Sequence, residues 1–468
     1  MTTRLVILGG GPAGNTCASV AATLGADVTL IERDIVGGAA HLWDCIPSKA
    51  LIATGGELSE LRRARLMGIQ ASGELDIDAL RVRVKSIEDR LHTSIRDLLT
   101  SQGVRLIEGT ARFAGPREIV VDRGSGGGAG GGAGGGAGGG AGGEEIEADV
   151  VLVATGSRPR VPDWATIDGE RVLTTRQAYP PPEVPRHIVV IGSGVTGVEF
   201  THMFRALGSG VTLVVSRQQV LPQKDPEVAA VLEDAFLERG ITLLKGARAK
   251  AVDRLADGVR VHCDDGRMVE ASHLVLAVGS IPNTEDIGLD IAGVDLDDAG
   301  YITVNHNCLS NVAHIYAAGD VSGKLPLSSV ASMQGRKIAE HLMGLHNRPH
   351  RHLDYDKAAS AIFTEPEIAD VGLAEAEAFA SGRKIRVTKV PFSANAKALI
   401  EGDPRGFVKI ISDPATGVVL GGSIVGRAAA ELISVLAVAV TNNLKVADIL
   451  DSLLVHPALS ESLADASS

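Results

Sequence analysis

The sequence predicts an α/β protein with parallel sheets, in which one kind of βαβ unit occurs twice. Strand-like apolar runs alternate with helical stretches, the pattern of parallel strands joined by crossover helices. A glycine-rich turn between a strand and a helix lies near residue 9 and returns near residue 192. The chain has 468 residues, 45% of them hydrophobic, which is enough for roughly two to four domains with packed cores.

The charge and the cysteines exclude several classes of protein. A formal net charge of −12, without a run of Lys and Arg, offers no positive surface to nucleic acid. The cysteines have no paired spacing, which argues against a secreted disulfide scaffold and against a zinc site: Cys17, Cys45, Cys263 and Cys308. We therefore expect a protein of the reducing cytoplasm without a metal centre.

Neither a signal peptide nor a membrane span is expected. In MTTRLVILGGGPAG the glycines end the apolar run before a signal-peptide core develops. The apolar stretch ELISVLAVAVTNN, bounded by Glu431 and Asn442, is too short to cross a bilayer. Peripheral contact with a membrane stays open.

The first predicted element is the strand LVIL, which runs into the turn GGGPAG and a helix. Gly9, Gly11 and Gly14 have the spacing G-x-G-x-x-G. The first glycine permits a tight turn, the second lets a pyrophosphate approach the backbone, and the third lets helix and strand pack closely. The free N–H groups at the helix N-terminus favour a bound phosphate. The alternative is a tight turn without a ligand.

The next strand, DVTLIER, supplies the acidic residue that such a unit requires. It ends at Glu32, whose carboxylate can accept hydrogen bonds from an adenosine ribose. Strand, glycine turn, helix and acidic residue together predict a dinucleotide-binding unit.

One long helix and one hairpin are predicted before the repeat. The segment 124–143 is almost entirely glycine and alanine, so we expect a flexible surface loop. Its flanks, REIVVD and EIEADVVLVATG, are typical of strands and place it at the tip of a hairpin. Upstream, apolar residues at three- and four-residue steps predict an amphipathic helix: Leu80, Val84, Ile87, Leu91, Ile95 and Leu98.

The second glycine turn lies in HIVVIGSGVTGVEF and is followed by the strand GVTLVVSRQQ. Gly192, Gly194 and Gly197 repeat the first pattern. Two dinucleotide folds in one chain indicate two dinucleotides that face each other, as in a flavin enzyme that a nicotinamide cofactor reduces.

The end of the strand after this second turn differs from its counterpart in charge. Where the first unit carries Glu32, the second has Val215, Ser216 and Arg217. No carboxylate repels a 2′-phosphate there and the guanidinium of Arg217 can pair with one, so we expect NADPH to be accepted beside NADH. The alternative is that Arg217 is only a solvated loop charge.

The order of motifs over nearly the whole chain resembles the FAD-dependent pyridine nucleotide-disulfide oxidoreductases, the group of dihydrolipoyl dehydrogenase and glutathione reductase. The motifs are GGGPAG, CIPSK, ATGSRP, GSGVTGVEF, IYAAGD, FTEPEIADVG and HPALSE. The resemblance implies two Rossmann-like dinucleotide-binding domains plus an α+β C-terminal dimerisation domain. The FAD domain would comprise 1–155 and 279–347, the NAD(P) domain 156–278, and the dimerisation domain of a homodimer 348–468.

The resemblance also implies roles for residues of the FAD domain. Asp320 of the AAGD motif would hold the ribityl chain of the flavin, while Ala154, Thr155 and Gly156 would cross near the flavin. Gly279 is assigned with them to nucleotide binding.

In the same family a lysine and a glutamate pair beside the reactive edge of the isoalloxazine, and they match Lys49 and Glu199. Taken alone, a Lys just after a helix-starting Pro47 and a Glu just past a glycine turn would be surface charges. Only their joint place in the motif order assigns them to a site.

The loop GGAAHLWDCIPSK departs from the family's redox loop, GGTCLNxGCIPSK. Aligned on GG and CIPSK, the first cysteine falls at Ala40, while Cys45 keeps the second, which in the family lies against the flavin. Four more positions also differ: His41, Leu42, Trp43 and Asp44. Exchange with a disulfide requires a thiolate that attacks sulfur, so dithiol-disulfide turnover is disfavoured.

The C-terminal motif VHPALSE retains His456 and Glu461, which match the family's acid-base pair serving the partner subunit. An imidazole acid could protonate a reduced sulfur or a reduced quinone oxygen, so His456 does not decide the acceptor. The alternative for a His-Pro pair near the terminus is a simple turn.

Within the group, this chain has GGAA in place of GGTC. In this it resembles the actinobacterial NAD(P)H:quinone reductases related to dihydrolipoyl dehydrogenase, and its stretch around Val220, Leu221 and Pro222 resembles that subgroup too. We therefore expect a homodimeric FAD enzyme that passes two electrons from NADPH or NADH to a quinone-like acceptor, with Cys45 tuning the flavin. Three alternatives remain. They are a dihydrolipoyl dehydrogenase-like disulfide reductase, a peroxide or oxygen reductase in which Cys45 cycles through a sulfenic acid, and an NAD(P)H-sensing binding module.

Overall fold

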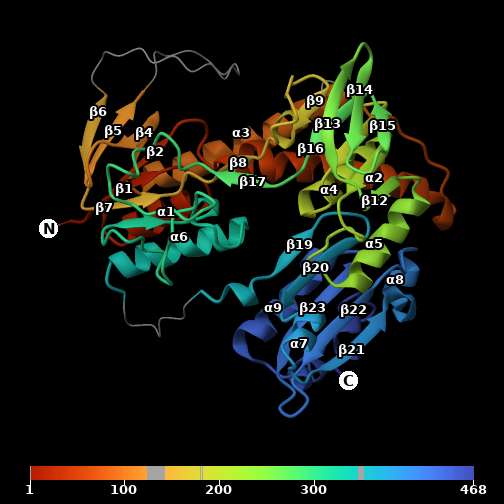
Figure 1. Cartoon of the computed structure of the whole chain (residues 1–468). Helices are drawn as coiled ribbons and strands as arrows, with labels where there is room; N and C mark the ends of the chain where they lie inside the picture. The colour runs from red at the N-terminus through yellow and green to blue at the C-terminus, as the bar shows by residue number, and fades with distance from the viewer. Residues whose placement is uncertain (1, 124–142, 180, 182, 346–352) are drawn as a thin grey trace. The chain divides into compact units, whose positions relative to one another are not determined.

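The computed structural model describes residues 2–123, 143–179, 181, 183–345 and 353–468 (Figure 1). The chain divides into two units. The first unit comprises residues 1–46, 85–158 and 280–355, and the second comprises 47–84, 159–279 and 356–468. The predicted loop of glycine and alanine lies outside the described residues except for Gly143.

The first unit is built on a parallel sheet of five strands in the order β18-β7-β1-β2-β3. Strands β7 and β2 flank β1, so the chain order reverses at β1, which places the first glycine turn at the switch point of the sheet. The strands are β1 (Arg4–Leu8), β2 (Asp27–Glu32), β3 (Arg105–Glu108), β7 (Val150–Val153) and β18 (Ile315–Ala317).

Helices α1 (Pro12–Thr23) and α6 (Ser328–Leu342) lie side by side against this sheet (Figure 1). A Cβ atom at Gly335 would come within 2.1 Å of the carbonyl oxygen of Ala13, so this glycine permits the close packing of the two helices. The predicted amphipathic helix is present as α3 (Ile77–Ser101). Buried Leu80 and Val84 lie on its apolar stripe.

An antiparallel sheet in the first unit contains both strands that flank the predicted glycine and alanine loop. It consists of β4 (Thr110–Phe113), β5 (Glu118–Asp122) and β6 (Glu144–Glu147). Ile119 of β5 pairs with Ile146 of β6. The prediction that these flanks form strands is confirmed.

A second parallel sheet of five strands, in the order β12-β11-β10-β16-β9, lies in the second unit and contains the strand before the second glycine turn. Its strands are β9 (Val172–Thr174), β10 (His187–Ile191), β11 (Gly210–Val215), β12 (Thr242–Lys245) and β16 (His273–Leu276). The second unit also contains α4 (Val195–Leu207), α5 (Pro226–Glu238) and most of α2 (Ile46–Arg63), with the antiparallel strands β13 (Ala249–Leu255), β14 (Gly258–Cys263) and β15 (Met268–Ala271).

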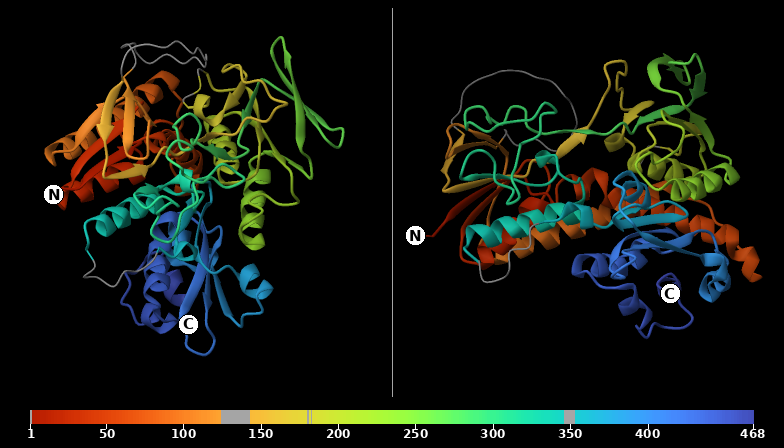
Figure 2. Two further views of the ribbon diagram at one scale, coloured as in Figure 1. Left: turned by 60° about the vertical axis from the view of Figure 1, so that its left-hand side comes forward. Right: turned by 60° about the horizontal axis from the view of Figure 1, so that its bottom comes forward.

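The C-terminal part of the second unit is an antiparallel sheet in the order β19-β20-β23-β22-β21, with α9 (Ala429–Asn442) packed against β20 and β23 (Figure 2). Its strands are β19 (Ser360–Ile362), β20 (Glu367–Gly372), β21 (Arg386–Pro391), β22 (Phe407–Ser412) and β23 (Val419–Gly426), and its short helices are α7 (Glu375–Ala380), α8 (Ala396–Ile400), α10 (Val446–Leu450) and α11 (Glu461–Asp465). Two parallel-sheet domains and an α+β C-terminal domain confirm the predicted fold class.

Helix α9 contains the apolar stretch that the sequence analysis judged too short for a membrane. One stripe of the helix, with Ile433, Leu436 and Val440, is buried against the sheet. Among the helices that the structure describes, none combines the length and the apolarity needed to cross a membrane.

Candidate active site

The glycines of the first turn have two different environments. A Cβ atom at Gly9, whose φ is +105°, would come within 2.4 Å of the carbonyl oxygen of Ala154, and a Cβ at Gly14 would come within 1.9 Å of the carbonyl oxygen of Gly9. A Cβ at Gly11 would meet no atom within 4 Å. The protein's own packing thus requires Gly9 and Gly14, whereas Gly11 faces open space at the N-terminus of α1. This arrangement fits a pyrophosphate that approaches the backbone at Gly11.

Glu32 lies at the carboxyl end of β2, beside the glycine turn. Its Oε2 accepts a hydrogen bond of 2.7 Å from the N–H of Gly10, and its Oε1 accepts one of 2.9 Å from the N–H of Asp34. Burial raises the pKa of Glu32, although these backbone donors favour the charged form. Each carboxylate oxygen keeps a lone pair that can accept from a ribose hydroxyl.

Residues 154–156 follow β7 and therefore lie at the same edge of the sheet. The Thr155 hydroxyl donates to the carbonyl oxygen of Asn283 at 2.8 Å, and the amide of Asn283 donates back to the carbonyl oxygen of Thr155 at 2.8 Å. Gly156 has a φ of +69°, and a Cβ there would meet no atom within 4 Å. The two hydrogen bonds between Thr155 and Asn283 thus hold these two segments together.

Asp320 begins a short 3-10 helix (Asp320–Ser322) just beyond β18. Its Oδ2 accepts a hydrogen bond of 2.6 Å from the hydroxyl of Ser157. The preceding residue, Gly319, donates its N–H to the side-chain oxygen of Gln334 at 2.7 Å. The first unit therefore gathers the glycine turn, Glu32, the 154–156 segment and Asp320 at the carboxyl ends of its strands, where an extended dinucleotide would lie.

The loop that contains Cys45 belongs to the first unit. Residues Ala40–Asp44 form a π-helix, and a Cβ at Gly38 would come within 2.8 Å of the Cα of Gly11, so the loop begins directly against the glycine turn. Cys45 follows as a half-buried thiol. All four cysteines lie among the described residues, and none of them forms a disulfide.

Within this loop the imidazole of His41 packs over Gly37, where a Cβ would come within 2.1 Å of its Nδ1. Burial lowers the pKa of His41, and the charge of nearby His92 lowers it further. The imidazole of His41 therefore favours its neutral form. It follows Ala40, the residue that aligns with the first cysteine of the redox loop.

The second glycine turn, in the second unit, repeats the geometry of the first. A Cβ at Gly192, with a φ of +110°, would come within 2.2 Å of the carbonyl oxygen of Ala277, and a Cβ at Gly197 within 1.8 Å of the carbonyl oxygen of Gly192. A Cβ at Gly194 would meet no atom within 4 Å, and the same is true at Gly279. The turn fits a second dinucleotide by the same physical criterion.

Arg217 lies two residues beyond the end of β11 and is exposed. Its carbonyl oxygen accepts a hydrogen bond of 3.1 Å from the N–H of Gly246. Among the residues that the structure describes, none forms an ion pair or a hydrogen bond with its guanidinium. The positive charge is therefore available to an anion.

Lys49 and Glu199 lie together in the second unit, on α2 and α4. The Nζ of Lys49 is 2.8 Å from the Oε2 of Glu199, whose side chain is only 8% exposed. The Oε1 of Glu199 accepts a hydrogen bond of 3.0 Å from the N–H of Phe363, and the ring of Phe363 lies 5.1 Å from the ammonium. The pair is thus a buried carboxylate that holds one side of an ammonium over an aromatic ring.

His456 and Glu461 also contact each other. The Nδ1 of His456 is 2.7 Å from the Oε1 of Glu461, and the N–H of Ala458 donates to the Oε2 at 2.8 Å. These bonds, first that from Ala458, lower the pKa of Glu461. The imidazole itself is 74% exposed, so its Nε2 can reach a molecule in solvent or on another subunit.

Sequence reasoning missed three residues that hold the predicted ones in place. They are Ser157 at Asp320, Asn283 at Thr155, and Phe363 at the Lys49–Glu199 pair. Ser157 follows the ATG motif directly and could have been inferred from its hydroxyl. Asn283 and Phe363 meet their partners through contacts distant in sequence, for which the chain gives no local signal.

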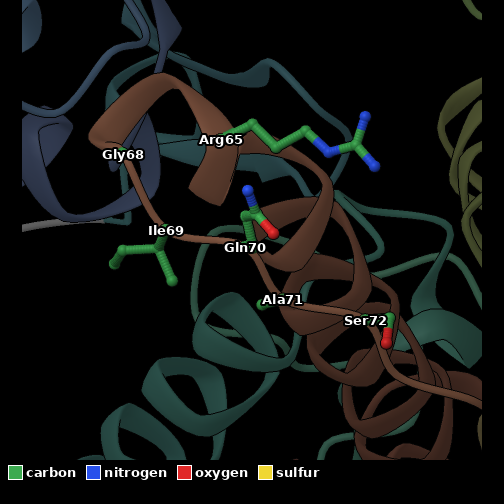
Figure 3. Close-up of a pocket in the computed structure, with 6 residues that line it drawn as sticks. All are labelled: Arg65, Gly68, Ile69, Gln70, Ala71 and Ser72. Carbon is green, nitrogen blue, oxygen red and sulfur yellow. The ribbon is translucent and has the colours of Figure 1, made fainter.

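Two other features of the second unit involve different residues. A surface pocket is lined by residues that follow α2, namely Arg65, Gly68, Ile69, Gln70, Ala71 and Ser72 (Figure 3), and none of them was predicted to belong to a site. The carboxylates of Asp225, Glu227 and Glu375 lie close together, but the ammonium of Lys409 contacts all three at 2.7, 2.6 and 2.8 Å. A cation of the protein itself therefore balances that cluster.

Comparison with known proteins gives consistent matches over the whole chain. The profile described as Pyridine nucleotide-disulphide oxidoreductase matches residues 3–335, and that of its dimerisation domain matches residues 358–467. A protein of Mycobacterium tuberculosis named NAD(P)H dehydrogenase (quinone) is 42% identical over 100% of this chain and 93% of its own length. The dihydrolipoyl dehydrogenase of Zymomonas mobilis is 33% identical over 98% of this chain and 96% of its own length.

Solved structures agree with these relatives. The crystal structure of LpdA from Mycobacterium tuberculosis has a TM-score of 0.92 and 41% identity, covering 100% of this chain and 99% of that one. The Cu(II) complex of the flavoprotein disulfide reductase RclA from Escherichia coli has a TM-score of 0.86 and 25% identity, with 100% and 99% coverage.

Proposed function

This chain belongs to the pyridine nucleotide-disulphide oxidoreductase family, and from that premise we propose that it transfers two electrons from NAD(P)H through FAD to a quinone-like acceptor. The family makes it an oxidoreductase of flavin and nicotinamide nucleotides. The choice of a quinone follows the relative of Mycobacterium tuberculosis named NAD(P)H dehydrogenase (quinone), at 42% identity.

One observation carries the choice of acceptor, namely the single cysteine of the loop. Ala40 stands where the family has the cysteine that exchanges with a disulfide substrate, and Cys45 forms no disulfide. A lone thiol cannot close a redox disulfide within the loop, so electrons must leave by another route. Direct transfer to a small planar acceptor satisfies this requirement without a second sulfur.

Two turns bind the nucleotides in this proposal. FAD supplies the two-electron carrier, with its pyrophosphate at Gly11, its adenosine ribose at Glu32 and its ribityl chain at Asp320, which Ser157 orients. The nicotinamide nucleotide takes the turn at Gly194, with Gly279 leaving further open space.

Arg217 allows the nicotinamide nucleotide to carry a 2′-phosphate. Its exposed guanidinium can pair with that phosphate, and Val215 leaves no carboxylate to repel it. NADPH is therefore accepted beside NADH.

The Lys49–Glu199 pair supplies fixed charge for electron transfer. Glu199 and the ring of Phe363 hold the ammonium in one place, so it can stabilise negative charge without reorganisation during the reaction. Cys45 contributes a polarizable sulfur to the same chemistry and does not itself turn over.

Protonation of the reduced acceptor is assigned to His456. Glu461, kept ionised by its bonds to Ala458 and His456, stabilises the protonated imidazole and orients it through Nδ1. The dimerisation domain supports a homodimer in which this pair serves the partner subunit. We place the enzyme in the cytoplasm, where cysteines outside disulfides stay reduced.

The proposal divides the chain into an FAD domain (1–155 and 279–347), an NAD(P) domain (156–278) and a dimerisation domain (348–468). An acceptor screen with the FAD-loaded enzyme and NADPH tests the function. We expect turnover with a soluble benzoquinone or naphthoquinone, and little with lipoamide or hydrogen peroxide. Faster lipoamide reduction would favour a disulfide reductase, faster peroxide reduction a cycling Cys45, and no turnover with any acceptor a binding module.

A further inference from the structure

A cluster of charged side chains in the second unit is centred on Glu365. The Nη1 of Arg63 lies 2.7 Å from the Oε1 of Glu365, and the Nη2 of Arg405 lies 3.1 Å from the same oxygen. Ser59 also favours the charged form of this carboxylate. Because Arg63 lies on α2, its ion pair holds Glu365 against that helix.

Arg63 extends this cluster to two further carboxylates. Its Nη1 lies 2.8 Å from Asp403 and its Nη2 lies 2.7 Å from Glu60. Asp403 is buried, and it also pairs with Arg405 at 2.6 Å. Because Asp403 is buried and the side chain of Glu365 is only 19% exposed, these two carboxylates have little water to replace their arginine partners.

The backbone next to Glu365 also contacts the Lys49–Glu199 pair. Glu365 follows Phe363 by two residues, and Phe363 donates its N–H to Glu199 and places its ring under Lys49. Lys49 lies on α2, the same helix that binds Glu365. The carboxylate of Glu365 thus fixes both the segment that contacts the Lys49–Glu199 pair and the helix that carries Lys49.

Helix α4, which carries Glu199, also carries the buried histidine His202. This residue lies one turn beyond Glu199, is 2% exposed, and accepts a hydrogen bond of 2.8 Å at Nδ1 from Arg239. Burial lowers the pKa of His202, Arg239 lowers it further, and the charge of Glu365 opposes the shift. The imidazole is therefore a neutral acceptor for Arg239.

We propose that Glu365 is a positioning residue for the Lys49–Glu199 pair, holding the Phe363 segment and helix α2 so that the ammonium keeps its place. The inference rests on the function proposed for that pair. Electrostatic catalysis requires fixed charges within a fraction of an ångström, and a displacement of about 1 Å can slow a reaction by up to about 100-fold. Glu365 acts without touching a substrate or cofactor, through Phe363 and α2.

A double-mutant comparison tests this role. The rate of flavin reduction by NADPH would be measured anaerobically, by stopped flow, for the parent enzyme, Glu365→Gln, Lys49→Met and the double variant, each loaded with FAD. We expect Glu365→Gln to slow reduction by about tenfold in the parent, and by less than about twofold in the Lys49→Met background, because residues that act through one group are not additive. The KM for NADPH and the FAD content should stay near those of the parent.

Glu270→Gln provides the matched control, since the side chain of Glu270 is 62% exposed and pairs with Arg260 in the same unit. It should leave all rates unchanged. If Glu365→Gln does not fold, Glu365→Asp keeps the charge but shortens the side chain, and the same non-additivity with Lys49→Met is expected for it.

Two outcomes would overturn the inference while leaving the proposed role of Lys49 intact. One is an unchanged rate in Glu365→Gln, and the other is an equal slowing in both backgrounds, which would show a purely structural effect. A Lys49→Met variant with the parent's rate would instead remove the proposed role of the pair itself, and the inference with it.

Discussion

At the scale of single residues, the glycines of each turn separate into those that the fold requires and one that it does not. Gly9 and Gly14 would place a Cβ within 2.4 and 1.9 Å of backbone oxygens, while Gly11 would meet nothing within 4 Å. The backbone of Gly11 is extended, with φ −68° and ψ −174°, a conformation open to any residue. The motif predicted a separate role for each glycine, with the pyrophosphate at the second, and of the three positions the structure leaves open space at Gly11.

Replacing Gly11 therefore separates binding from folding. Gly11→Leu should keep the melting temperature of the apoprotein but lose most bound FAD, because the side chain fills the space of the pyrophosphate. The ratio of flavin to protein absorbance measures this. Gly56→Ala is the control, since Gly56 lies in α2 with open space around it and an alanine there should stabilise the helix by about 0.5–1 kcal/mol. Full flavin retention in Gly11→Leu would count heavily against this placement.

Cys45 allows a second test at this scale. If electrons pass directly to the acceptor, Cys45→Ser should slow NADPH:quinone turnover by no more than about threefold while changing the flavin spectrum, because it removes a polarizable sulfur but no obligatory carrier. Steady-state assays and absorbance spectra of the variant check both parts.

The companion variant Ala40→Cys should confer at most weak lipoamide activity, since Trp43 and Asp44 still differ from the family's loop. Complete loss of quinone turnover in Cys45→Ser, with FAD still bound, would falsify direct transfer.

At the scale of secondary-structure elements, local patterns predicted what depends on local physics. Regular spacing of apolar residues gave the helix α3 (Ile77–Ser101), and the flanks of the glycine and alanine segment gave the paired strands β5 and β6. The π-helix Ala40–Asp44 was not foreseen, because it depends on how the loop packs against the first glycine turn. The Lys49–Glu199 contact was predicted only through a family resemblance, since those residues are far apart in sequence and each alone looks like a surface charge.

The buried imidazole of His202 on α4, which accepts a hydrogen bond from Arg239, predicts how stability depends on pH. Because the pKa of His202 is lowered below its usual 6.5 in the fold, the unfolded chain binds a proton that the folded chain does not. The neutral imidazole of His202 therefore leaves the free energy of unfolding unchanged above pH 6.5. Below that pH the free energy of unfolding falls, by up to about 1.4 kcal/mol per pH unit.

His202→Gln keeps an acceptor for Arg239 but does not titrate, so its free energy of unfolding should fall less steeply between neutral and mildly acid pH. Urea unfolding of both proteins at several pH values gives the comparison. Parallel curves for parent and variant would show that His202 does not titrate on unfolding.

At the scale of the whole molecule, the chain contains two glycine turns of the same kind, and these support a reaction between two dinucleotides. Each unit carries a strand, a glycine turn and a helix whose middle glycine faces open space, at Gly11 and at Gly194. The repeat and the motif order could be predicted from the sequence because such turns constrain consecutive residues. The charges that hold the second unit together could not, since Arg63, Glu365 and Arg405 meet only after folding.

The exposed imidazole of His456 leads to a prediction about the assembly. If the His456–Glu461 pair serves the partner subunit, two inactive variants should complement each other in a mixed dimer. His456→Ala alone should slow quinone reduction by about 100-fold or more, as expected for loss of a general acid. Lys49→Met alone should be slow as well.

After the two variants are co-expressed with different tags, half of the dimers formed at random are mixed, and one of the two sites in each mixed dimer has an intact Lys49 and receives His456 from the partner. Symmetry then predicts that the unseparated mixture regains about a quarter of the parent activity. Purification through both tags should raise this to about half. If His456 instead serves its own subunit, every site in the mixed dimer lacks one of the two residues, and the doubly purified protein would be as slow as the single variants. A His456→Ala homodimer with normal turnover would show that the acceptor takes its proton from another group.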